Sequence, residues 1–286
     1  MNRGVRHALA LVGPATLLFL GVVLTPLVMT LLLSLNDWNT SQGIVPVITT
    51  KNFAEIFSDS YFAEIFLRTL RISLWVTVIC VVIGAPEAYI LRRMSEPWRS
   101  IFVFVVIGPL LLSVVARTLG WALLLSGNGL ISTALQKLGL TTRPVSLMFT
   151  ETGVIIALVH VLVPFMVLSV WAALARMDPA VERAAQSLGA SQTTIFRRIV
   201  LPQAMPGILS GSIVVFSLAA SAFATPAIIG GRRLKVVSTL AYDEFLNTLN
   251  WPLGAALAIL LLVGIIAVVV GWNRVVERRY AQVFAS

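Results

Sequence analysis

The sequence is poor in charge, cysteine and histidine, and each shortage excludes a class of protein. Only 12% of its 286 residues are charged, while 58% are hydrophobic. A soluble domain of this size carries about twice that charged fraction, so the composition indicates an integral membrane protein. The one cysteine, Cys80, lies in an apolar run, which excludes a disulfide framework and a thiolate cluster for a metal. The two histidines, His7 and His160, and scattered serines form no cluster typical of a membrane-embedded hydrolase.

A phosphate-binding loop is also absent. The pattern G-x-x-x-x-G-K-[ST] occurs nowhere, so an ATPase that drives this chain would be another polypeptide. The net charge of +9 is compatible with nucleic-acid binding. However, the basic residues mostly flank apolar runs in small groups, as they do where they orient membrane helices. We therefore expect contact with a lipid bilayer, no nucleic acid, and no metal or cofactor on this chain.

Six apolar runs are long enough to cross a bilayer as helices, since a span needs about 20 residues. They are residues 8–35, 72–91, 101–125, 153–175, 207–230 and 253–272. The first follows Arg3 and Arg6 as in a signal peptide, but it is too long for one and no A-x-A-like site follows, so we expect an uncleaved helix. Six spans put both termini on one side, and a moderate arginine excess there predicts that this side is cytoplasmic.

The predicted fold is an all-α, polytopic membrane protein without a soluble domain. We expect an N-terminal helix and outer segment over residues 1–64 and a membrane core over 65–273. The core contains a cytoplasmic loop, 178–206, and a tail follows over 274–286. A short external helix is expected between the third and fourth spans, ending at Gly139.

The 178–206 loop is polar, regular and bounded by apolar runs. Asp178 is a favourable N-cap, and Pro179 suits the first helical position. Gly189 ends the helix, because glycine readily takes a positive φ. The apolar face of this helix consists of Val181, Ala184, Ala185 and Leu188.

A second helix of the loop is expected to begin after Ser191, which can act as its N-cap. Pro202 and Pro206 are expected to end it before the next apolar run. The result would be two short helices joined by a glycine hinge at the membrane surface.

The spacing in this loop resembles the EAA loop of ABC-importer permeases: E-A-A, three residues, G, nine residues, then I-x-L-P. The matching residues are Ala184, Ala185, Gly189, Ile199, Leu201 and Pro202. Arg183 occupies the glutamate position of the family, and Glu182 lies one residue earlier. The resemblance implies that these eight residues couple the chain to a separate ATPase subunit. An ordinary pair of amphipathic surface helices is the alternative.

Other segments resemble permeases of the spermidine/putrescine type. They lie around Pro109, Arg117, Trp121 and Gly129, at 163–165, at 223–231 and at 250–258. The resemblance spans about residues 65–272 and implies the type I ABC importer (MetI-like) permease fold in a bacterial inner membrane. It also implies a periplasmic binding protein, a second permease that is more often a related chain, and ATP with Mg on the ATPase. The implied cargo is a polyamine-like solute, although the wider subfamily also moves other small solutes.

Four residues within the spans are candidates for the translocation path: Arg117, Trp121, His160 and Ser217. A charge such as Arg117 costs about 2.5–3.5 kcal/mol within a bilayer, so it either lines a path or has a structural partner. Trp121 lies four residues later on the same helical face, and it either shapes the path or belongs to an aromatic belt. His160 binds a ligand or a neighbouring backbone group.

Ser217 suits either close helix packing or a path. Glu87 lies late in the second span, and we expect it to pair with Arg92 or Arg93 rather than with a substrate. A secondary transporter driven by an ion gradient would require acids within the membrane, and only Glu87 is available, at an edge. The sequence therefore favours a permease subunit over that alternative and over an enzyme. The substrate stays open, because polyamines would need carboxylates or aromatic cages along the route.

Overall fold

The computed structural model describes residues 3–284, with side chains described for residues 12–274. Within this range six helices are long and apolar enough to cross a membrane, as predicted. They are Val12–Ser34, Ser60–Arg93, Val114–Lys137, Glu151–Leu174, Gln192–Ala220 and Trp251–Arg274. The all-α prediction is confirmed, and the small β-hairpin that accompanies the helices lies outside these spans.

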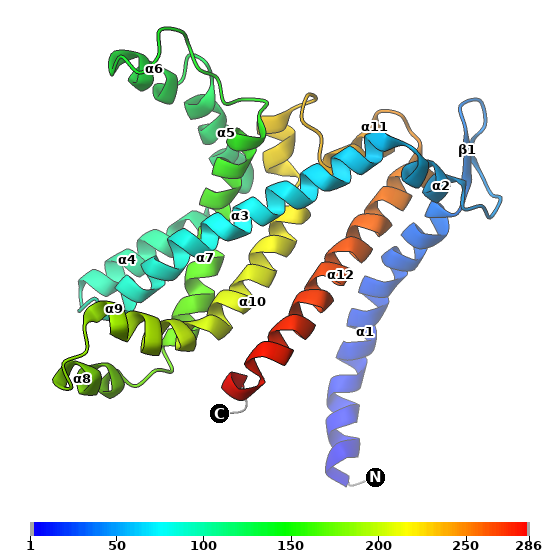
Figure 1. Cartoon of the computed structure of the whole chain (residues 1–286). Coiled ribbons are helices and arrows are strands. Elements are labelled where there is room, and N and C mark those ends of the chain that lie inside the picture. Colours follow the sequence, from blue (N-terminus) through cyan, green and yellow to red (C-terminus); the bar gives the residue numbers. More distant parts are fainter. Residues whose placement is uncertain (1–2, 285–286) are drawn as a thin grey trace. The chain divides into compact units, whose positions relative to one another are not determined.

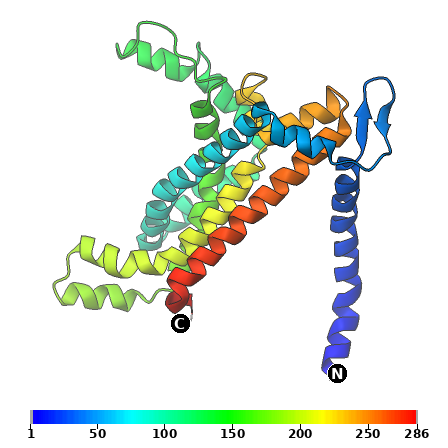
Figure 2. The ribbon, with the colours of Figure 1, turned by 45° about the vertical axis from the view of Figure 1, so that its right-hand side comes forward.

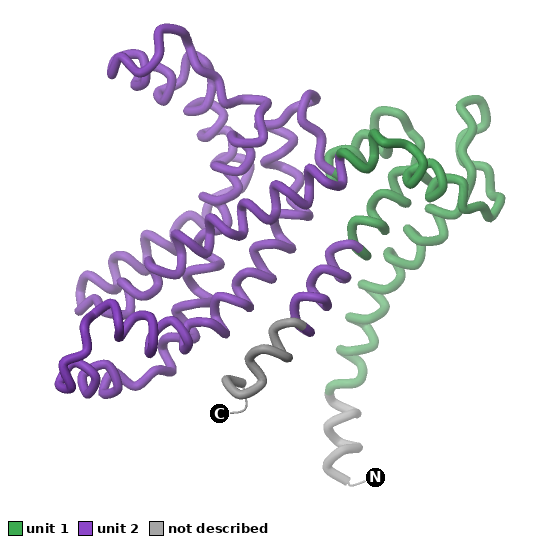
Figure 3. The backbone as a smooth tube through the Cα atoms, viewed as in Figure 1, with its two compact units in different colours: residues 1–64, 237–263 green, residues 65–236, 264–286 purple. Residues whose placement is uncertain are grey.

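The chain divides into two compact units (Figure 3). Unit 1 comprises residues 1–64 and 237–263, so the predicted N-terminal part shares its unit with a later segment. Its elements are α1 (Arg3–Ser34), β1 (Asp37–Asn39), β2 (Gly43–Val45), α2 (Lys51–Ser58), α11 (Val237–Leu246) and the first part of α12 (Trp251–Phe284). The side chain of Asn52 donates to the carbonyls of Ser34 and Asn36, at 2.9 and 2.8 Å, and so satisfies acceptors at the end of α1.

Unit 2 comprises residues 65–236 and 264–286 and contains the helices that carry the candidate sites. Its elements are α3 (Ser60–Arg93) from residue 65 on, α4 (Trp98–Ile107), η1 (Gly108–Leu111), α5 (Val114–Leu125), α6 (Leu130–Lys137), α7 (Glu151–Leu174), α8 (Pro179–Ser187), α9 (Gln192–Ile195), η2 (Phe196–Val200), α10 (Leu201–Ala220), η3 (Pro226–Gly230) and the end of α12. Helix α6 and helices α8 and α9 lie at opposite ends of α7 in both views (Figures 1 and 2). The short helix predicted between the third and fourth apolar runs is α6, which forms the last part of the candidate span Val114–Lys137, and Gly139 follows it with φ +70°.

Small residues bring α10 close to α7. A Cβ on Gly207 would lie 2.6 Å from the carbonyl oxygen of Ser169 and 2.8 Å from the Cα of Val170. A Cβ on Gly211 would lie 2.8 Å from the sulfur of Met166. The glycines therefore serve the close helix packing that small residues permit in membranes.

Several helix boundaries differ from the prediction, and the predicted fifth span, 207–230, ends at Ala220. The expected third span, 101–125, is divided, because Pro109 lacks an N–H and the backbone tightens into η1 before becoming extended at Leu112. Conversely, neither Pro202 nor Pro206 ends the second helix of the loop, since α9, η2 and α10 continue into one another and α10 contains Pro206. The π-turn η2 ends with the N–H of Leu201 donating to the carbonyl of Phe196, and this wider turn accommodates the proline that follows.

Ion pairs join α3 to other parts of unit 2 at both of its ends. At one end Arg71 forms an ion pair with Glu151, the first residue of α7, and Arg68 lies 3.5 Å from the same carboxylate. At the other end Arg92 and Arg93 bind Glu182 of α8. Between these ends Gly84 packs against Met166 of α7, where a Cβ would lie 2.9 Å from the Met166 Cγ.

Candidate functional site

The 178–206 loop has the caps that the sequence predicts. Asp178 Oδ1 accepts from the N–H of Ala180 at 2.8 Å, and Ser191 Oγ accepts from the N–H of Thr194 at 3.3 Å. Gly189 has φ +78°, and its N–H bonds to Gln186, while the next residue bonds back to Ala185. This pair of bonds is a Schellman motif, so the turn between α8 and α9 depends on a left-handed residue at position 189.

The eight predicted coupling residues divide between two sides of the loop. Four are exposed: Arg183, Ala184, Gly189 and Pro202. The other four face the protein: Glu182 is buried, and Ala185, Ile199 and Leu201 pack against the core. Val181 is 43% exposed and Leu188 is 88% exposed, so α8 presents an apolar stripe of Val181, Ala184 and Leu188 to the outside. An exposed apolar stripe on an otherwise polar helix is typical of a docking surface.

Glu182 lies on the inner face of α8, between two arginines of α3. Its Oε1 accepts from Arg92 at 2.5 Å and its Oε2 accepts from Arg93 at 2.6 Å. Arg92 also donates to the carbonyl of Met177 at 3.2 Å, and Arg93 donates to Gln192 at 3.3 Å. The structure therefore places the Glu182 carboxylate inside the chain, while Arg183 occupies the exposed face. Glu87 does not receive the partners expected for it, because both arginines bind Glu182.

The two arginines keep the Glu182 carboxyl ionised. Burial alone would raise its pKa, but hydrogen bonds and positive charge from Arg93 and Arg92 outweigh burial and hold the pKa below its ordinary value. Because the folded-state pKa is the lower one, the stabilisation is present above the ordinary glutamate pKa. It is lost as the pH falls through the folded-state value.

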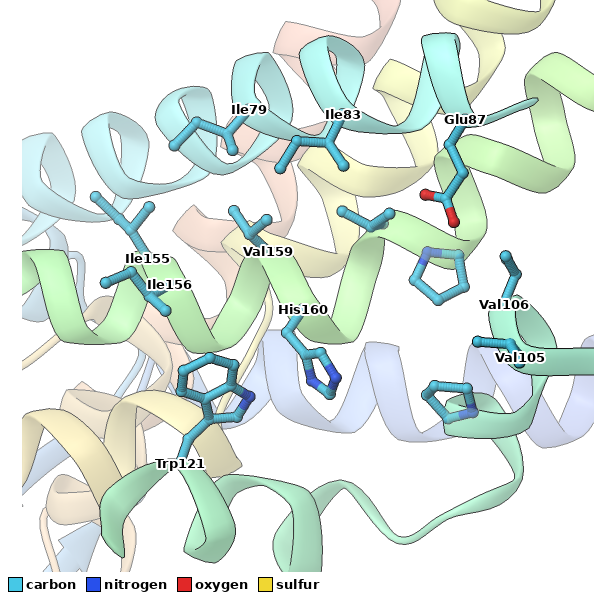
Figure 4. Close-up of a pocket in the computed structure, with 13 residues that line it drawn as sticks. Ile79, Ile83, Glu87, Val105, Val106, Trp121, Ile155, Ile156, Val159 and His160 are labelled. Carbon is cyan, nitrogen blue, oxygen red and sulfur yellow. The ribbon is translucent and has the colours of Figure 1, made fainter. Parts of the chain in front are cut away.

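A second candidate site is a cavity of about 570 Å³ between α3, α7 and the α4–α5 segment (Figure 4). This volume lies in the range of small-molecule sites. Aliphatic side chains form most of its wall. Its polar or aromatic members are Glu87 from α3, Trp121 from α5 and His160 from α7. The rings of Trp121 and His160 meet edge to face, with centroids 5.5 Å apart.

The cavity contains two of the four predicted path residues. Trp121 and His160 line it, so the Trp121 side chain turns toward the interior of the unit rather than outward. Arg117 lies one helical turn before Trp121 but is not part of the lining. Ser217 lies on α10, also outside the lining, and its carbonyl accepts from Ser221.

Glu87 is the cavity residue that sequence reasoning assigned elsewhere. It follows Ile79 and Ile83 at intervals of four residues, and all three side chains line the cavity. This spacing puts them on one face of α3. The signal was therefore present in the sequence, as an acid that continues an apolar stripe.

Arg117 has buried polar atoms that are not satisfied within the described part of the chain. Its Nε and Nη1 are buried and have no hydrogen-bond partner there. Buried donors without a partner are costly, so a second molecule that accepts from them would be favoured at this place.

Comparison with known proteins identifies the chain's relatives. The family described as "binding-protein-dependent transport system inner membrane component" matches residues 73–282. The spermidine/putrescine transport system permease protein PotB of Salmonella typhimurium (strain SL1344) is 35% identical over 215 residues, which are 75% of each chain. PotB of Haemophilus influenzae is 32% identical over 237 residues, which are 83% of this chain and 82% of that protein. In fold, the chain resembles a bacterial alginate ABC transporter crystallised with its alginate-bound periplasmic protein, with TM-score 0.75, 20% identity, and coverage of 94% of this chain and 93% of that one.

Proposed function

Because the chain belongs to the family of binding-protein-dependent transport system inner membrane components and is a permease subunit of an ABC importer, we propose that it moves a polyamine-like solute. We further propose that a periplasmic binding protein delivers the solute and that a separate ATPase supplies the energy. A second permease, most simply a related chain, completes the route. ATP and Mg belong to the ATPase in this proposal.

The ATPase docking surface is the exposed side of the 178–206 loop. The stripe of Val181, Ala184 and Leu188 is apolar and exposed. The small residues Ala184 and Gly189 on this surface let a partner backbone approach closely. Arg183 lies beside this stripe, where it can pair with an acid of the ATPase.

The cavity is the part of the translocation path that this chain supplies. The observation that carries the amine assignment is the presence of Glu87 and Trp121 in one cavity with an otherwise mostly aliphatic wall. A carboxylate binds an ammonium ion by charge, and an aromatic face binds it by cation–π attraction. The test of the function is uptake of labelled spermidine and putrescine that requires the binding protein and stops when the ATPase cannot hydrolyse ATP.

A solute that carries a carboxylate is the second candidate. The observation that favours it is the buried Arg117 guanidinium, whose Nε and Nη1 have no partner within the described residues. A guanidinium binds carboxylates in paired geometry and repels ammonium ions. The two candidates therefore differ in which residue, Glu87 or Arg117, transport requires.

We expect Glu87→Gln to lower the initial rate of polyamine uptake about tenfold or more, since a hydrogen bond to a charged group contributes about 1.5–3 kcal/mol. The measurement is uptake in membrane vesicles at equal permease abundance. Glu55→Gln, which changes an exposed acid of α2, is the matched control and should retain wild-type uptake. Arg117→Leu should retain polyamine uptake if amines are the cargo. Normal uptake in Glu87→Gln together with its loss in Arg117→Leu would overturn the amine assignment.

Both termini should be cytoplasmic, which places the 178–206 loop where an ATPase can bind it. Thr142, an exposed residue after α6, should react as cysteine with an impermeant thiol reagent in intact cells, in a background without Cys80. Ser286 lies outside the described residues, and a cysteine there should react only after the cells are opened. Labelling of position 286 in intact cells would contradict this orientation.

A further inference from the structure

We propose that Glu182 is a positioning residue, whose ion pairs with Arg92 and Arg93 transmit movement of the docking helix α8 to the cavity wall. The inference rests on the proposed function, because it presumes that an ATPase moves α8. It assigns Glu182 a role within the chain, in place of the direct contact with the ATPase that the family resemblance implies.

The two arginines contact both helices of the 178–206 loop and the residue just before the loop. Arg92 binds Glu182 and the carbonyl of Met177, just before α8. Arg93 binds Glu182 and also Gln192, the first residue of α9. One carboxylate and two guanidinium groups thus connect α3 with both helices of the loop.

Aromatic contacts extend the same junction. The Arg93 guanidinium carbon lies 4.6 Å from the ring centroid of Tyr89, one turn earlier on α3. The Tyr89 ring lies 5.5 Å from that of Phe196, in the π-turn η2. The junction therefore has two layers, ionic and aromatic. In the ionic layer the Arg92–Glu182 pair is shielded, with side chains 11% and 9% exposed, while the Arg93 side chain is 39% exposed. Shielded ion pairs resist screening by salt and hold a fixed geometry.

Helix α3 connects this junction directly with the cavity. Its last two turns carry Glu87 at one end and Arg92 and Arg93 at the other. Pro86, just before them, donates no backbone hydrogen bond, which makes this point of the helix easier to bend. Two residues before Pro86, the backbone of Gly84 packs closely against the Met166 side chain of α7. A displacement of α8 would therefore move the segment 87–93, with Glu87, relative to a fixed upper part of α3.

A direct contact between Glu182 and the ATPase does not fit this geometry. Glu182 is 7% exposed and both of its oxygens already accept hydrogen bonds from arginines. Reaching a partner would require both ion pairs to break. Arg183, next in sequence and exposed, is available for such a contact without any rearrangement.

The test uses the complete transporter, with ATPase, second permease and binding protein, reconstituted in lipid. Glu182→Gln keeps the shape of the side chain and removes its charge. We expect the ATPase to copurify at the wild-type ratio and basal ATP hydrolysis to persist. Uptake should fall at least about tenfold, because α8 loses its ionic connection to α3. Arg183→Gln is the matched control on the neighbouring exposed position and should instead weaken ATPase association.

A direct readout separates positioning from a general structural defect. Ile83 lies on the fixed part of α3 and lines the same cavity as Glu87. A cysteine replacing Ile83, in a background without Cys80, should change its reactivity toward a small thiol reagent when the ATPase is trapped with nucleotide, because Glu87 then moves relative to it. In Glu182→Gln this change should disappear although the ATPase remains bound. Arg93→Gln removes the more exposed of the two ion pairs of Glu182. It should reduce the reactivity change rather than abolish it, again with the ATPase bound. If the Glu182→Gln permease fails to accumulate, Arg93→Gln becomes the test variant in its place.

Three outcomes overturn the inference. The first is a Glu182→Gln permease in which the cysteine at position 83 changes its reactivity as it does in the wild type. The second is loss of the ATPase from a normally abundant Glu182→Gln permease. The third is a double variant Arg92→Gln/Glu182→Gln that transports worse than the worse single variant, since residues that act through one contact are not additive. If the wild-type complex itself neither binds an ATPase nor transports, the proposed function fails instead.

Discussion

Replacing Gly189 with aspartate should abolish uptake while the permease still inserts and accumulates nearly normally. A side chain at φ +78° costs about 1–2 kcal/mol, which a folded chain tolerates. Within the chain, a Cβ at this position meets no atom within 4 Å, so the new carboxylate extends outward. It would therefore introduce bulk and negative charge at the surface that we assign to the ATPase. The measurement is uptake together with the amount of ATPase that copurifies.

The matched control is Gly139→Asp. Gly139 has φ +70° and equally open surroundings, but it follows α6, at the opposite end of α7 from the docking surface. The two substitutions thus impose similar backbone strain at different surfaces. Gly139→Asp should leave ATPase binding unchanged. Normal uptake and ATPase binding in Gly189→Asp would remove the coupling role from this loop.

Gly207→Leu should prevent normal accumulation of the permease. Its Cβ alone would lie within 2.6 to 2.8 Å of backbone atoms of Ser169 and Val170, and backbone atoms cannot turn aside as a flexible side chain can. Helices α7 and α10 would have to separate, and we expect a loss of about 3 kcal/mol or more of stability, at the upper end for overpacking. The measurement is membrane abundance and the thermal unfolding midpoint in detergent.

A glycine of α12 provides the control for this effect. Gly264 also lies in an apolar span, but no atom lies within 4 Å of a Cβ built there. Gly264→Leu should therefore accumulate as the wild type does. Equal abundance of Gly207→Leu and the wild type would mean that α7 and α10 do not pack as closely as the structure indicates.

The local features of the 178–206 loop could be predicted because neighbouring residues determine them. Asp178 and Ser191 cap helices through backbone groups two or three residues away, and Gly189 needs only its own freedom of φ. The apolar runs likewise predict six spans because crossing a bilayer depends on length and composition. Where the sequence analysis was wrong, at Pro202, a change of helix type in the preceding turn kept the helix continuous.

The parts that could not be predicted depend on distant contacts. Glu182 binds Arg92, which lies 90 residues earlier, and a sequence with many arginines does not show which of them is the partner. The cavity is formed by segments of α3, α4, η1, α5 and α7 that only the folded chain brings together. The pairing of Trp121 with His160 is of the same kind. Glu87 is an intermediate case, since its interval from Ile83 placed it on the cavity-lining face of α3.

The arginines at both ends of α3 have a consequence for biosynthesis. The acid that Arg71 binds lies 80 residues later in the chain, and the acid that Arg92 binds lies 90 residues later. While the ribosome is still making the later segments, α3 therefore has arginines near each end and neither acid yet exists. Arginines near both ends give α3 little arginine bias of its own for one orientation. We expect its orientation to depend on the segments on either side, and its ion pairs with α7 and α8 can form only after those helices have been made.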